Sequence, residues 1–450
     1  MTITTRFAPA PTGQLHLGNL RTAVLNWLLA RKGGGRFLLR IDDTDRARSD
    51  ERYVGAIRDD LSWLGIPPDE EARQSERFER YEAEFTRLRE AGRIYPAYET
   101  PEELELARKV RLGRGLPPVY DRAALRLSDA ERARLEAEGR APHWRFRLDH
   151  ERPIEWADGV RGPQRFDAHD IGDPVIRRAD GSWLYLFPSA VDDMDLRVTD
   201  VVRGEDHVTN SAVHVQMWEA LGHAAPRMAH TALIVSTEGK LSKREGAAGV
   251  DQLRADGIEP LAVLAFLARI GTSLPVEPVA SAEALIESFD LATFGRAPAR
   301  FDPHELETLS ARTLHGLPVE AVRGRVPDVI GPRQWEVVRS ALTRVEDADG
   351  WAEVLAGASD LPAPSEEDRE YLRRAAEVAE GLDWDADPWG ALTAALKART
   401  GRKGKALFLP LRLALTGRAQ GPEMAALLPL IPKETAVGRL RANAAAPSAA

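Results

Sequence analysis

The sequence predicts an α/β protein whose N-terminal part is built on a parallel sheet and whose C-terminal part is helical. Two observations favour this class. Over the first 66 residues, strand and helix patterns alternate at lengths that imply parallel strands joined by crossover helices. From about residue 250 onward, apolar residues recur mainly at helical spacing, as between residues 261 and 267.

Each element of the first part has its own local signal. Prolines and a glycine in residues 9–13 end an extended start, because proline cannot occupy the interior of a helix. Leucines then recur at helical spacing until the glycines at 33–35. The expected elements are an extended segment over 4–8, a helix from near His16 to before Gly33, a strand over 37–41 and a helix over 53–64.

Residues 70–182 differ from this pattern and are interpreted as an inserted or separate module. They are rich in Arg and Glu, and prolines at 117–118 and glycines between 159 and 162 interrupt them. The sheet pattern then returns, with strands expected over 183–187, 198–202 and 232–235 and a helix over about 209–221. The end of the chain, 442–450, is rich in Ala, Pro and Ser and is expected to fray.

The composition limits the classes of function. Of 450 residues, 43% are apolar and 29% charged, as in globular rather than disordered proteins. With 61 Lys and Arg against 70 Asp and Glu, the net charge of −9 excludes a protein coated with nucleic acid but allows a local basic patch. The lack of cysteine excludes disulfides, thiolate nucleophiles and Cys-ligated metals. No apolar run approaches the ~18 residues of a membrane span and no signal core follows Met1, so a cytoplasmic location is expected.

The first candidate for chemistry is the turn from Ala8 to Asn19, which leads from the extended segment into a helix. Amides at a helix start, together with the helix dipole, attract phosphate. Gly18 has no side chain, so a flat ring can lie on the backbone, and His16 can donate a hydrogen bond or charge to a phosphate. Taken alone, the segment fits equally well a helix that merely begins with a polar residue.

The second candidate is the segment 240–244 (Lys-Leu-Ser-Lys-Arg), which follows a glycine and an apolar strand. Three cations and a hydroxyl suit a clamp for polyphosphate. Alone, a short basic run is more simply a solvated surface. Together, the His-x-Gly-Asn turn at 16–19 and this later segment resemble the paired signatures of class I aminoacyl-tRNA synthetases.

Further segments narrow this resemblance to one family within the class. These segments are residues 6–9, 11–13, 40–48, 191–193, 202–207 and 412–417. Over nearly the whole chain, and most specifically through about residue 250, the sequence resembles the bacterial-type glutamyl-tRNA synthetases. The resemblance implies ATP-dependent ligation of L-glutamate to tRNA(Glu) in two steps through glutamyl-adenylate, with release of AMP and diphosphate. Positioning and electrostatic stabilisation carry such a reaction.

The resemblance also implies a domain order. The expected fold is a split Rossmann-type parallel sheet with an inserted acceptor-end module, then a helical connector and an all-α anticodon-binding domain. The expected boundaries are 1–85 and 183–245 for the two halves of the catalytic domain, 86–182 for the acceptor-stem module, 246–320 for the connector that contacts the tRNA stem and 321–450 for the anticodon-binding domain.

The family's site residues are carried over where the motifs match. The positions that match catalytic residues are His16, Asn19, Lys240 and Lys243. The positions that match ATP-binding residues are Gly18, Glu205, Asp206, His207, Lys240, Ser242, Lys243 and Arg244. The positions that match glutamate-binding residues are Arg6, Ala8, Ala10, Asp42, Arg48, Tyr185, Ser189 and Arg203. Arg6 is expected on the side-chain carboxylate of glutamate and Asp42 on its α-ammonium group.

Five positions depart from the family's usual residues. Asp42 stands where the family usually has Glu, Ala10 where it has Ser, and Ser189 where some members have Asn. Asn19 stands where many relatives in the wider class have a second His, and Glu245 where His or Lys is common. Both of these last changes lower the positive charge expected near the phosphates.

Several positions have a structural alternative. Arg6 could simply pair with a neighbouring acid, and Tyr185 is nearly as well explained as a core residue. The remaining candidates are interpreted as turn, cap or loop residues (Asp43, Asp45, Asp192 and Asp193) or as core residues (Trp183 and Trp218).

Some family members carry a zinc knuckle near residues 95–99, but Ala97 and Glu99 occupy the cysteine positions here, so structural zinc is not expected. Mg²⁺ is expected only as a companion of ATP.

A cationic stretch near the end of the chain is a candidate for tRNA binding, because no acid lies between positions 397 and 418. Taken alone, the stretch fits a solvated face, whereas in the family context it predicts a surface for the tRNA backbone. Its cations are Lys397, Arg399, Arg402, Lys403, Lys405, Arg412 and Arg418.

Four other functions fit the sequence less well. A paralogue that transfers glutamate to a modified tRNA base generally lacks an anticodon-binding part, whereas about 200 residues follow position 240 here. Glutaminyl-tRNA synthetases usually end in β-barrels. A non-catalytic relative would have lost His16, Lys240 or Lys243, and a small nucleotidyltransferase would be far shorter. Use of tRNA(Gln) as a second substrate is left open, and a monomer is the default expectation.

Overall fold

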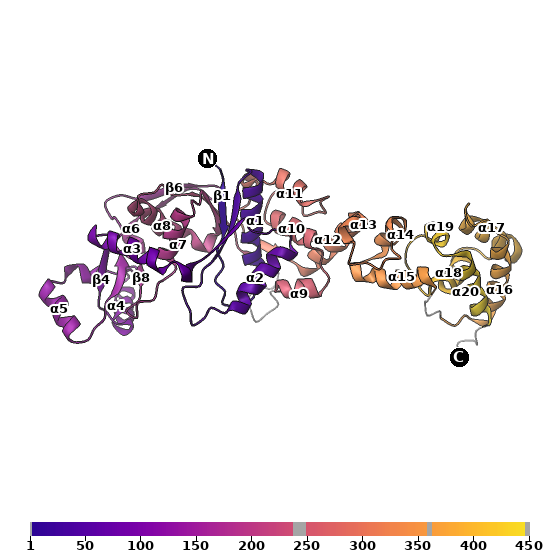
Figure 1. Ribbon diagram of the computed structural model, residues 1–450, viewed down its shortest axis with the longest axis horizontal. Helices are drawn as coiled ribbons and strands as arrows, with labels where there is room; N and C mark the ends of the chain where they lie inside the picture. The colour runs from indigo at the N-terminus through magenta and orange to yellow at the C-terminus, as the bar shows by residue number, and fades with distance from the viewer. Residues whose placement is uncertain (1, 237–248, 358–361, 446–450) are drawn as a thin grey trace. The chain divides into compact units, whose positions relative to one another are not determined.

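The computed structural model describes residues 2–236, 249–357 and 362–445, and every structural statement below concerns these residues. The chain forms two compact units (Figure 1). The first comprises Met1–Asp256 and Val263–Leu306, and the second comprises Gly257–Ala262 and Glu307–Ala450.

The first unit is built on parallel strands joined by helices. One sheet has the order β1-β2-β3, formed by Thr4–Phe7, Arg36–Ile41 and Glu70–Arg73, with α1 (Leu17–Lys32) and α2 (Glu51–Trp63) as crossovers. A second sheet has the order β7-β6-β10-β9, formed by Gly162–Phe166, Ile154–Asp158, Arg227–Thr231 and Asp200–Gly204. β10 runs parallel to both neighbours, and α8 (Val208–Leu221) connects β9 to β10. The predicted α/β class is confirmed.

The two sheets meet along β1 and β9. The backbone N–H of Thr199 donates to the Thr4 carbonyl over 2.9 Å. Further along, the buried side chain of Asn26 on α1 takes the place of a neighbouring strand. Its amide nitrogen donates to the Val202 carbonyl at 2.8 Å, and its amide oxygen accepts from the Val202 N–H at 3.4 Å. One side chain therefore satisfies both backbone groups of a strand residue where the sheet is split.

Replacing Asn26 by Leu should lower the free energy of unfolding of the first unit by about 2–4 kcal/mol, because a buried N–H and a buried C=O would both lose their partner. Urea denaturation measures this loss. The exposed Gln14, replaced by Leu, serves as the control and should change stability by less than about 0.5 kcal/mol. Equal stability of the Asn26 variant and the parent protein would contradict this role of the amide.

The remaining elements of the first unit surround these sheets. α3 (Phe78–Glu90), α7 (Leu186–Asp195) and α8 share a core that contains Phe85, Trp183 and Trp218. β4 (Ile94–Ala97), β5 (His143–Phe146) and β8 (Val175–Arg177) form a separate antiparallel sheet. The other elements are α4 (Pro101–Gly113), α5 (Asp129–Ala137), α6 (Ala168–Ile171), α9 (Val250–Ala255), α11 (Ala282–Ser288) and the parallel pair β11 (Ile234–Ser236) and β12 (Ala299–Phe301).

Among the described residues of the second unit, the regular elements are all helical. Its core contains Trp335, Trp351, Tyr371 and Leu411, and α16 (Glu366–Glu380) packs along α20 (Lys433–Ala445). The other helices are α13 (Val319–Val322), α14 (Pro332–Val338), α15 (Ala348–Ala356), α17 (Pro388–Thr400), α18 (Lys405–Thr416) and α19 (Met424–Leu427), while α10 (Pro260–Arg269) and α12 (Pro303–Gly316) have residues in both units.

Two predicted strands were placed wrongly. In 183–187, Trp183 makes only an isolated bridge with Arg177, and α7 begins at Leu186. Alternating aromatic and leucine residues also fit the start of a helix, and Pro188 lies in the first turn, where a missing N–H has no cost. The strand expected at 232–235 runs over Ile234–Ser236 instead, and β10, which precedes it, was not predicted.

The described part of the chain contains no helix long and apolar enough to cross a bilayer. Its His, Asp and Glu side chains form no cluster that could hold a metal ion. At the two positions considered above for a zinc knuckle, Ala97 is buried in β4 and Glu99 accepts a hydrogen bond from the Tyr120 hydroxyl at 2.7 Å. These two positions therefore have packing and hydrogen-bonding roles.

Candidate functional site

Helix α1 begins at a histidine cap. His16 has extended backbone, and its Nδ1 accepts from the backbone N–H of Gly18 at 3.1 Å and of Asn19 at 3.4 Å. The expected attraction of phosphate to amides at this helix start is therefore limited, because the ring already accepts from the Gly18 and Asn19 amides. Because Nδ1 is an acceptor, the proton of the neutral imidazole lies on Nε2. A Cβ at Gly18 would lie 3.1 Å from the ring, so glycine leaves room for the cap.

A buried ionic cluster lies at the carboxyl ends of β1 and β2. Arg6 Nε and Arg40 Nη1 both donate to Asp193 Oδ1, at 3.0 and 2.9 Å. Arg40 also binds Asp42 through two hydrogen bonds, of 2.7 and 3.0 Å, and donates to Ser189 Oγ at 2.9 Å. Burial raises the pKa of Asp42 to about 6. Burial also opposes ionisation of Asp193, but Arg6 and Arg40 together lower its pKa. Asp193 and Arg40 thus bring together three of the residues predicted to bind the substrate glutamate. These are Arg6, Asp42 and Ser189.

Arg203 on β9 is a buried guanidinium held by neutral groups. It is 5% exposed, and the described residues include no carboxylate in a salt bridge with it. Nη1 donates to the Tyr185 hydroxyl at 3.0 Å, and Nη2 donates to Ser211 Oγ at 2.5 Å and faces His214 Nδ1 at 3.3 Å. Its Nε has no hydrogen-bond partner among the described residues. A buried cation without an acid is costly, so the site is suited to an anionic ligand.

The residues predicted for ATP follow β9 directly, in a short 3₁₀ turn over Glu205–His207. The ring centroid of His207 lies 6.0 Å from that of Tyr185, and burial lowers its pKa to about 4, so His207 is neutral at pH 7. Glu205 forms an ion pair with Arg161, whereas Asp206 is exposed. His207, Tyr185 and Arg203 are therefore brought together.

Other predicted residues lie apart from this network. Arg48 is 71% exposed and binds Asp45 at 2.7 Å, Ala10 is exposed, and Ala8 is half-buried. The segment predicted to hold phosphate (Lys240, Ser242, Lys243 and Arg244) lies outside the described residues. The first described residue after it, Gly249, forms a bridge with His16.

The aspartates interpreted as structural divide into two kinds. Asp192 accepts hydrogen bonds from Gln74, Tyr81 and Arg77 and fits the structural interpretation. Asp193, in contrast, binds Arg6 and Arg40, and Arg40 is a site residue that the sequence analysis misses. The available signal was a charged residue inside the apolar strand over 37–41, since a buried arginine requires partners.

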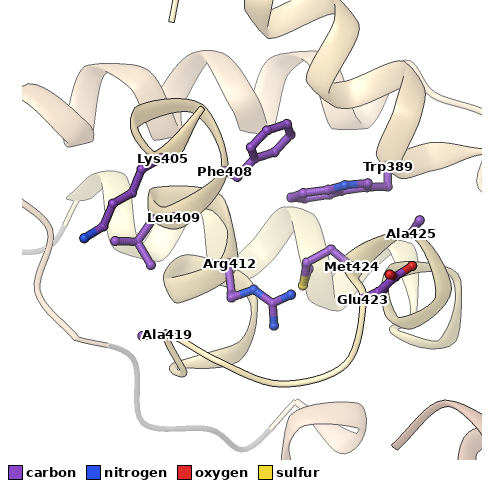
Figure 2. A pocket seen from close by; sticks show the side chains of 9 residues that line it. All are labelled: Trp389, Lys405, Phe408, Leu409, Arg412, Ala419, Glu423, Met424 and Ala425. Atoms are coloured by element: carbon purple, nitrogen blue, oxygen red, sulfur yellow. The ribbon is translucent and has the colours of Figure 1, made fainter. Parts of the chain in front are cut away.

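The second unit contains a pocket of about 400 Å³ near the predicted cationic surface. Figure 2 shows the rings of Trp389 and Phe408 and the guanidinium of Arg412 around this pocket, with Met424 and Glu423 on its border. The two rings are 6.1 Å apart between centroids. Arg412 Nη2 donates to the Pro422 carbonyl at 2.8 Å, while its buried Nη1 has no hydrogen-bond partner in the part of the chain that the structure describes. The pocket thus offers aromatic faces and a guanidinium donor.

The predicted cations of this surface differ from one another. Lys397, Arg399, Lys403 and Lys405 are exposed. Arg402 is paired with Glu367 at 2.9 Å and Asp368 at 2.5 Å, and lies over the Tyr371 ring at 4.4 Å. Because two carboxylates neutralise it, Arg402 adds little to the local positive potential.

The first unit thus combines a histidine-capped helix after the first parallel strand, a split sheet and a buried arginine that has no carboxylate partner among the described residues. The family described as tRNA synthetases class I (E and Q), catalytic domain, matches residues 2–308, and the family described as anticodon binding domain matches residues 358–444. The chain is 62% identical to glutamate–tRNA ligase 1 of Rhizorhabdus wittichii and 60% identical to glutamate–tRNA ligase 2 of Erythrobacter litoralis. Each comparison covers 98% of this chain, and 100% and 98% of the two relatives. The chain belongs to the glutamate–tRNA ligase family of class I tRNA synthetases.

Solved structures agree with this assignment. The chain is similar to the crystal structure of a glutamate tRNA ligase from Elizabethkingia meningosepticum in complex with its amino acid, with a TM-score of 0.81, 27% identity and 99% of each chain covered. It is also similar to the glutamate–tRNA synthetase of Elizabethkingia anophelis, with a TM-score of 0.79, 28% identity and 98% and 99% of the two chains covered. The predicted order of a class I catalytic domain followed by a helical anticodon-binding domain is confirmed.

Proposed function

We propose that this glutamate–tRNA ligase joins L-glutamate to tRNA(Glu) in two steps. In the first, a glutamate carboxylate oxygen attacks the α-phosphate of ATP, which forms glutamyl-adenylate and releases diphosphate. In the second, the terminal ribose hydroxyl of the tRNA attacks the acyl carbon and AMP leaves. The observation that carries the proposal is the buried Arg203, which the described residues leave without an acid partner and which an amino-acid carboxylate can neutralise.

The described residues support a division of labour around glutamate. Arg203, held by the Tyr185 hydroxyl, receives a carboxylate, and Arg6 lies in the same site with its Nε on Asp193. Asp42 is tied to Arg40 through two hydrogen bonds, so binding of the α-ammonium group there would share the carboxylate with Arg40. The pairing of Arg6 with Asp193 orients a guanidinium without neutralising it fully, since Asp193 also serves Arg40.

For ATP, we assign His16 Nε2 as a hydrogen-bond donor to phosphate and neutral His207 as a neighbour of the base or ribose. The assignment of Lys240, Ser242, Lys243 and Arg244 to the phosphates rests on the sequence. Mg²⁺ is proposed as a companion of ATP, whose phosphates supply most of its ligands. We expect no structural zinc in a chain without cysteine, and propose a monomer in the cytoplasm.

Charging of two separate transcripts tests the proposal. Radiolabelled glutamate, ATP and either tRNA(Glu) or tRNA(Gln) are supplied, and we expect tRNA(Glu) to be charged. Charging of tRNA(Gln) as well would define a non-discriminating enzyme. Charging of neither transcript, with glutamate transferred instead to a base of native tRNA, would contradict the proposal and favour the tRNA-modifying alternative.

The pocket in the second unit is proposed to bind an unstacked base of the tRNA, because aromatic faces stack on bases and the Arg412 guanidinium lines the same pocket. Trp389→Ala should raise the KM for tRNA about 10- to 100-fold and leave the KM for glutamate unchanged, since base stacking is worth about 1–3 kcal/mol. The control is Trp384→Ala, at a partly buried indole that donates to the Ile431 carbonyl at 2.9 Å and is not among the residues of this pocket. An unchanged KM for tRNA in the Trp389 variant would remove the pocket from the tRNA surface.

A further inference from the structure

Behind Arg203, a chain of hydrogen bonds passes through three side chains on three different elements. Arg203 Nη2 lies 2.5 Å from Ser211 Oγ on α8. Ser211 Oγ lies 2.7 Å from His230 Nε2 on β10, and His230 Nδ1 lies 2.5 Å from Asp158 Oδ2 at the end of β6. Ser211 and His230 are fully buried, and Asp158 is 5% exposed. The chain links strands β9, β10 and β6 across the second sheet.

The proton positions along this chain are determined by its ends. Burial favours a neutral Asp158, but hydrogen bonds from His230 and from the backbone of Arg161 lower its pKa below the usual range. An ionised carboxylate can only accept, so His230 carries its proton on Nδ1 and Nε2 is an acceptor. Burial lowers the pKa of His230 as well, which keeps the ring neutral. The Ser211 hydroxyl must then donate to Nε2, and its oxygen is left to accept from Arg203.

Asp158 is a firm anchor for this chain. Its Oδ1 accepts from the backbone N–H of Val160 at 3.0 Å, of Arg161 at 2.9 Å and of His230 at 3.1 Å. The indole N–H of Trp156 donates to Oδ2 at 3.3 Å. A carboxylate held by this many donors cannot rotate without leaving buried N–H groups unsatisfied, so the orientation of the His230 ring is determined too.

An aspartate, a histidine and a serine in this order also resemble the nucleophile arrangement of serine hydrolases. The burial of Ser211 argues against that function, because no substrate can reach a hydroxyl with no exposed surface. Its oxygen is in addition occupied by the Arg203 guanidinium. The arrangement therefore acts on Arg203 rather than on a substrate of its own.

We propose that Ser211, His230 and Asp158 are positioning residues that hold the Arg203 guanidinium in the orientation that receives the glutamate carboxylate. This inference rests on the proposed function. An acid in direct contact would orient the guanidinium but would also neutralise it. The hydrogen-bonded chain of Ser211, His230 and Asp158, here called the relay, provides a neutral acceptor at Arg203. It places the negative charge of Asp158 two side chains away, so the positive charge of Arg203 remains available to the substrate.

A second neutral acceptor supports the same interpretation. His214 Nε2 lies 3.0 Å from the Leu186 carbonyl, which can only accept, so the His214 proton lies on Nε2 and its Nδ1 accepts from Arg203 Nη2. Burial lowers the pKa of His214, so this ring is also neutral. Arg203 Nη2 thus contacts two uncharged side chains, Ser211 and His214. Each of them presents an acceptor to Arg203 because its own proton is donated elsewhere.

The test compares KM and kcat for charging of tRNA(Glu) by the full chain. Ser211→Ala should raise the KM for glutamate about 10- to 100-fold, because the hydrogen bond that orients the charged Arg203 guanidinium is lost. The KM for ATP and the KM for tRNA should stay within about threefold, because Arg203 is proposed to bind glutamate alone. Ser211→Thr keeps the hydroxyl and should restore the KM for glutamate to within about threefold. Asp158→Asn removes the ionised end of the relay and should raise the same KM.

The matched control is Thr231→Val, next to His230 on β10. Its hydroxyl is also buried, but it lies 3.5 Å from the Arg203 carbonyl rather than from the guanidinium, so the KM for glutamate should not change. A Ser211→Ala protein with the parent's KM for glutamate, or with equal losses for all three substrates, would overturn the positioning role. A parent chain that charges no tRNA with glutamate would overturn the proposed function and this inference with it.

Discussion

Replacing Arg203 by Gln should raise the KM for glutamate in tRNA charging by at least about 100-fold and leave the KM for ATP within about threefold. The reason is that charge-assisted hydrogen bonds to a carboxylate are worth about 1.5–3 kcal/mol each, and each 1.4 kcal/mol is tenfold in affinity. Arg203→Lys keeps the charge but not the planar fork, so a smaller but clear increase is expected. The control is Arg227→Gln on the neighbouring strand, where the arginine is 71% exposed and pairs with Asp200.

Stability separates this explanation from a structural one. Arg203 is buried and the described residues provide no carboxylate partner for it, so its replacement by a neutral side chain should leave the free energy of unfolding unchanged or raise it. A structural arginine would show the opposite result, with a lower unfolding midpoint and a loss of activity toward all substrates. Urea denaturation beside the kinetics therefore decides between the two, and an unchanged KM for glutamate would remove Arg203 from the site.

The elements that carry the site were largely predictable from local pattern. The helix from near His16, the strand over 37–41 and the helix over 209–221 are present as α1, β2 and α8 with small shifts at their ends. Each has a period or a boundary signal in its own residues. The failure at 183–187 is also local, because alternating large apolar residues over one helical turn cannot distinguish a strand from a helix start.

The contacts between the elements were not predictable in the same way. The resemblance pointed to Arg6, Asp42, Ser189 and Arg203, but it gave no reason for Arg40, whose partner Asp193 is more than 150 residues away in sequence. Pattern shows which face of a strand is buried, but it does not identify the residue that a buried charge meets across the fold. The relay behind Arg203 was invisible for the same reason, since Asp158, His230 and Ser211 lie on three separate elements.

The cationic stretch over 397–418 illustrates the same limit. Its lack of acids within the stretch suggested one continuous basic surface. In three dimensions Glu367 and Asp368, on a different helix, neutralise Arg402, while Arg412 turns toward an aromatic pocket. A count of charges along the chain therefore overstates the positive potential of this surface. The arginine that differs from the others is Arg412, whose Nη1 has no hydrogen-bond partner among the described residues.

Replacing His16 by Asn should lower the rate of adenylate formation by about 100- to 1,000-fold without changing the stability of the first unit. Asn is among the preferred N-cap residues, so the amides of Gly18 and Asn19 keep an acceptor. The Nε2–H donor proposed to act on the phosphate is lost, and removal of one such donor has an effect of this size. ATP–pyrophosphate exchange with glutamate and saturating tRNA(Glu) measures the rate, and urea denaturation measures the stability.

His16→Ala completes the argument, because it removes the cap and the donor together. It should lose the same rate and, in addition, about 1 kcal/mol of stability. Ser281→Ala removes the N-cap of α11 in the same unit and should lose similar stability with full activity. If His16→Asn kept the parent rate while His16→Ala did not, the function of His16 would be the start of α1 alone, and the phosphate donor would have to lie elsewhere. A rate loss in both variants with stability lost in only one assigns the two nitrogens of a single ring to two separate tasks, Nδ1 to the helix and Nε2 to the reaction.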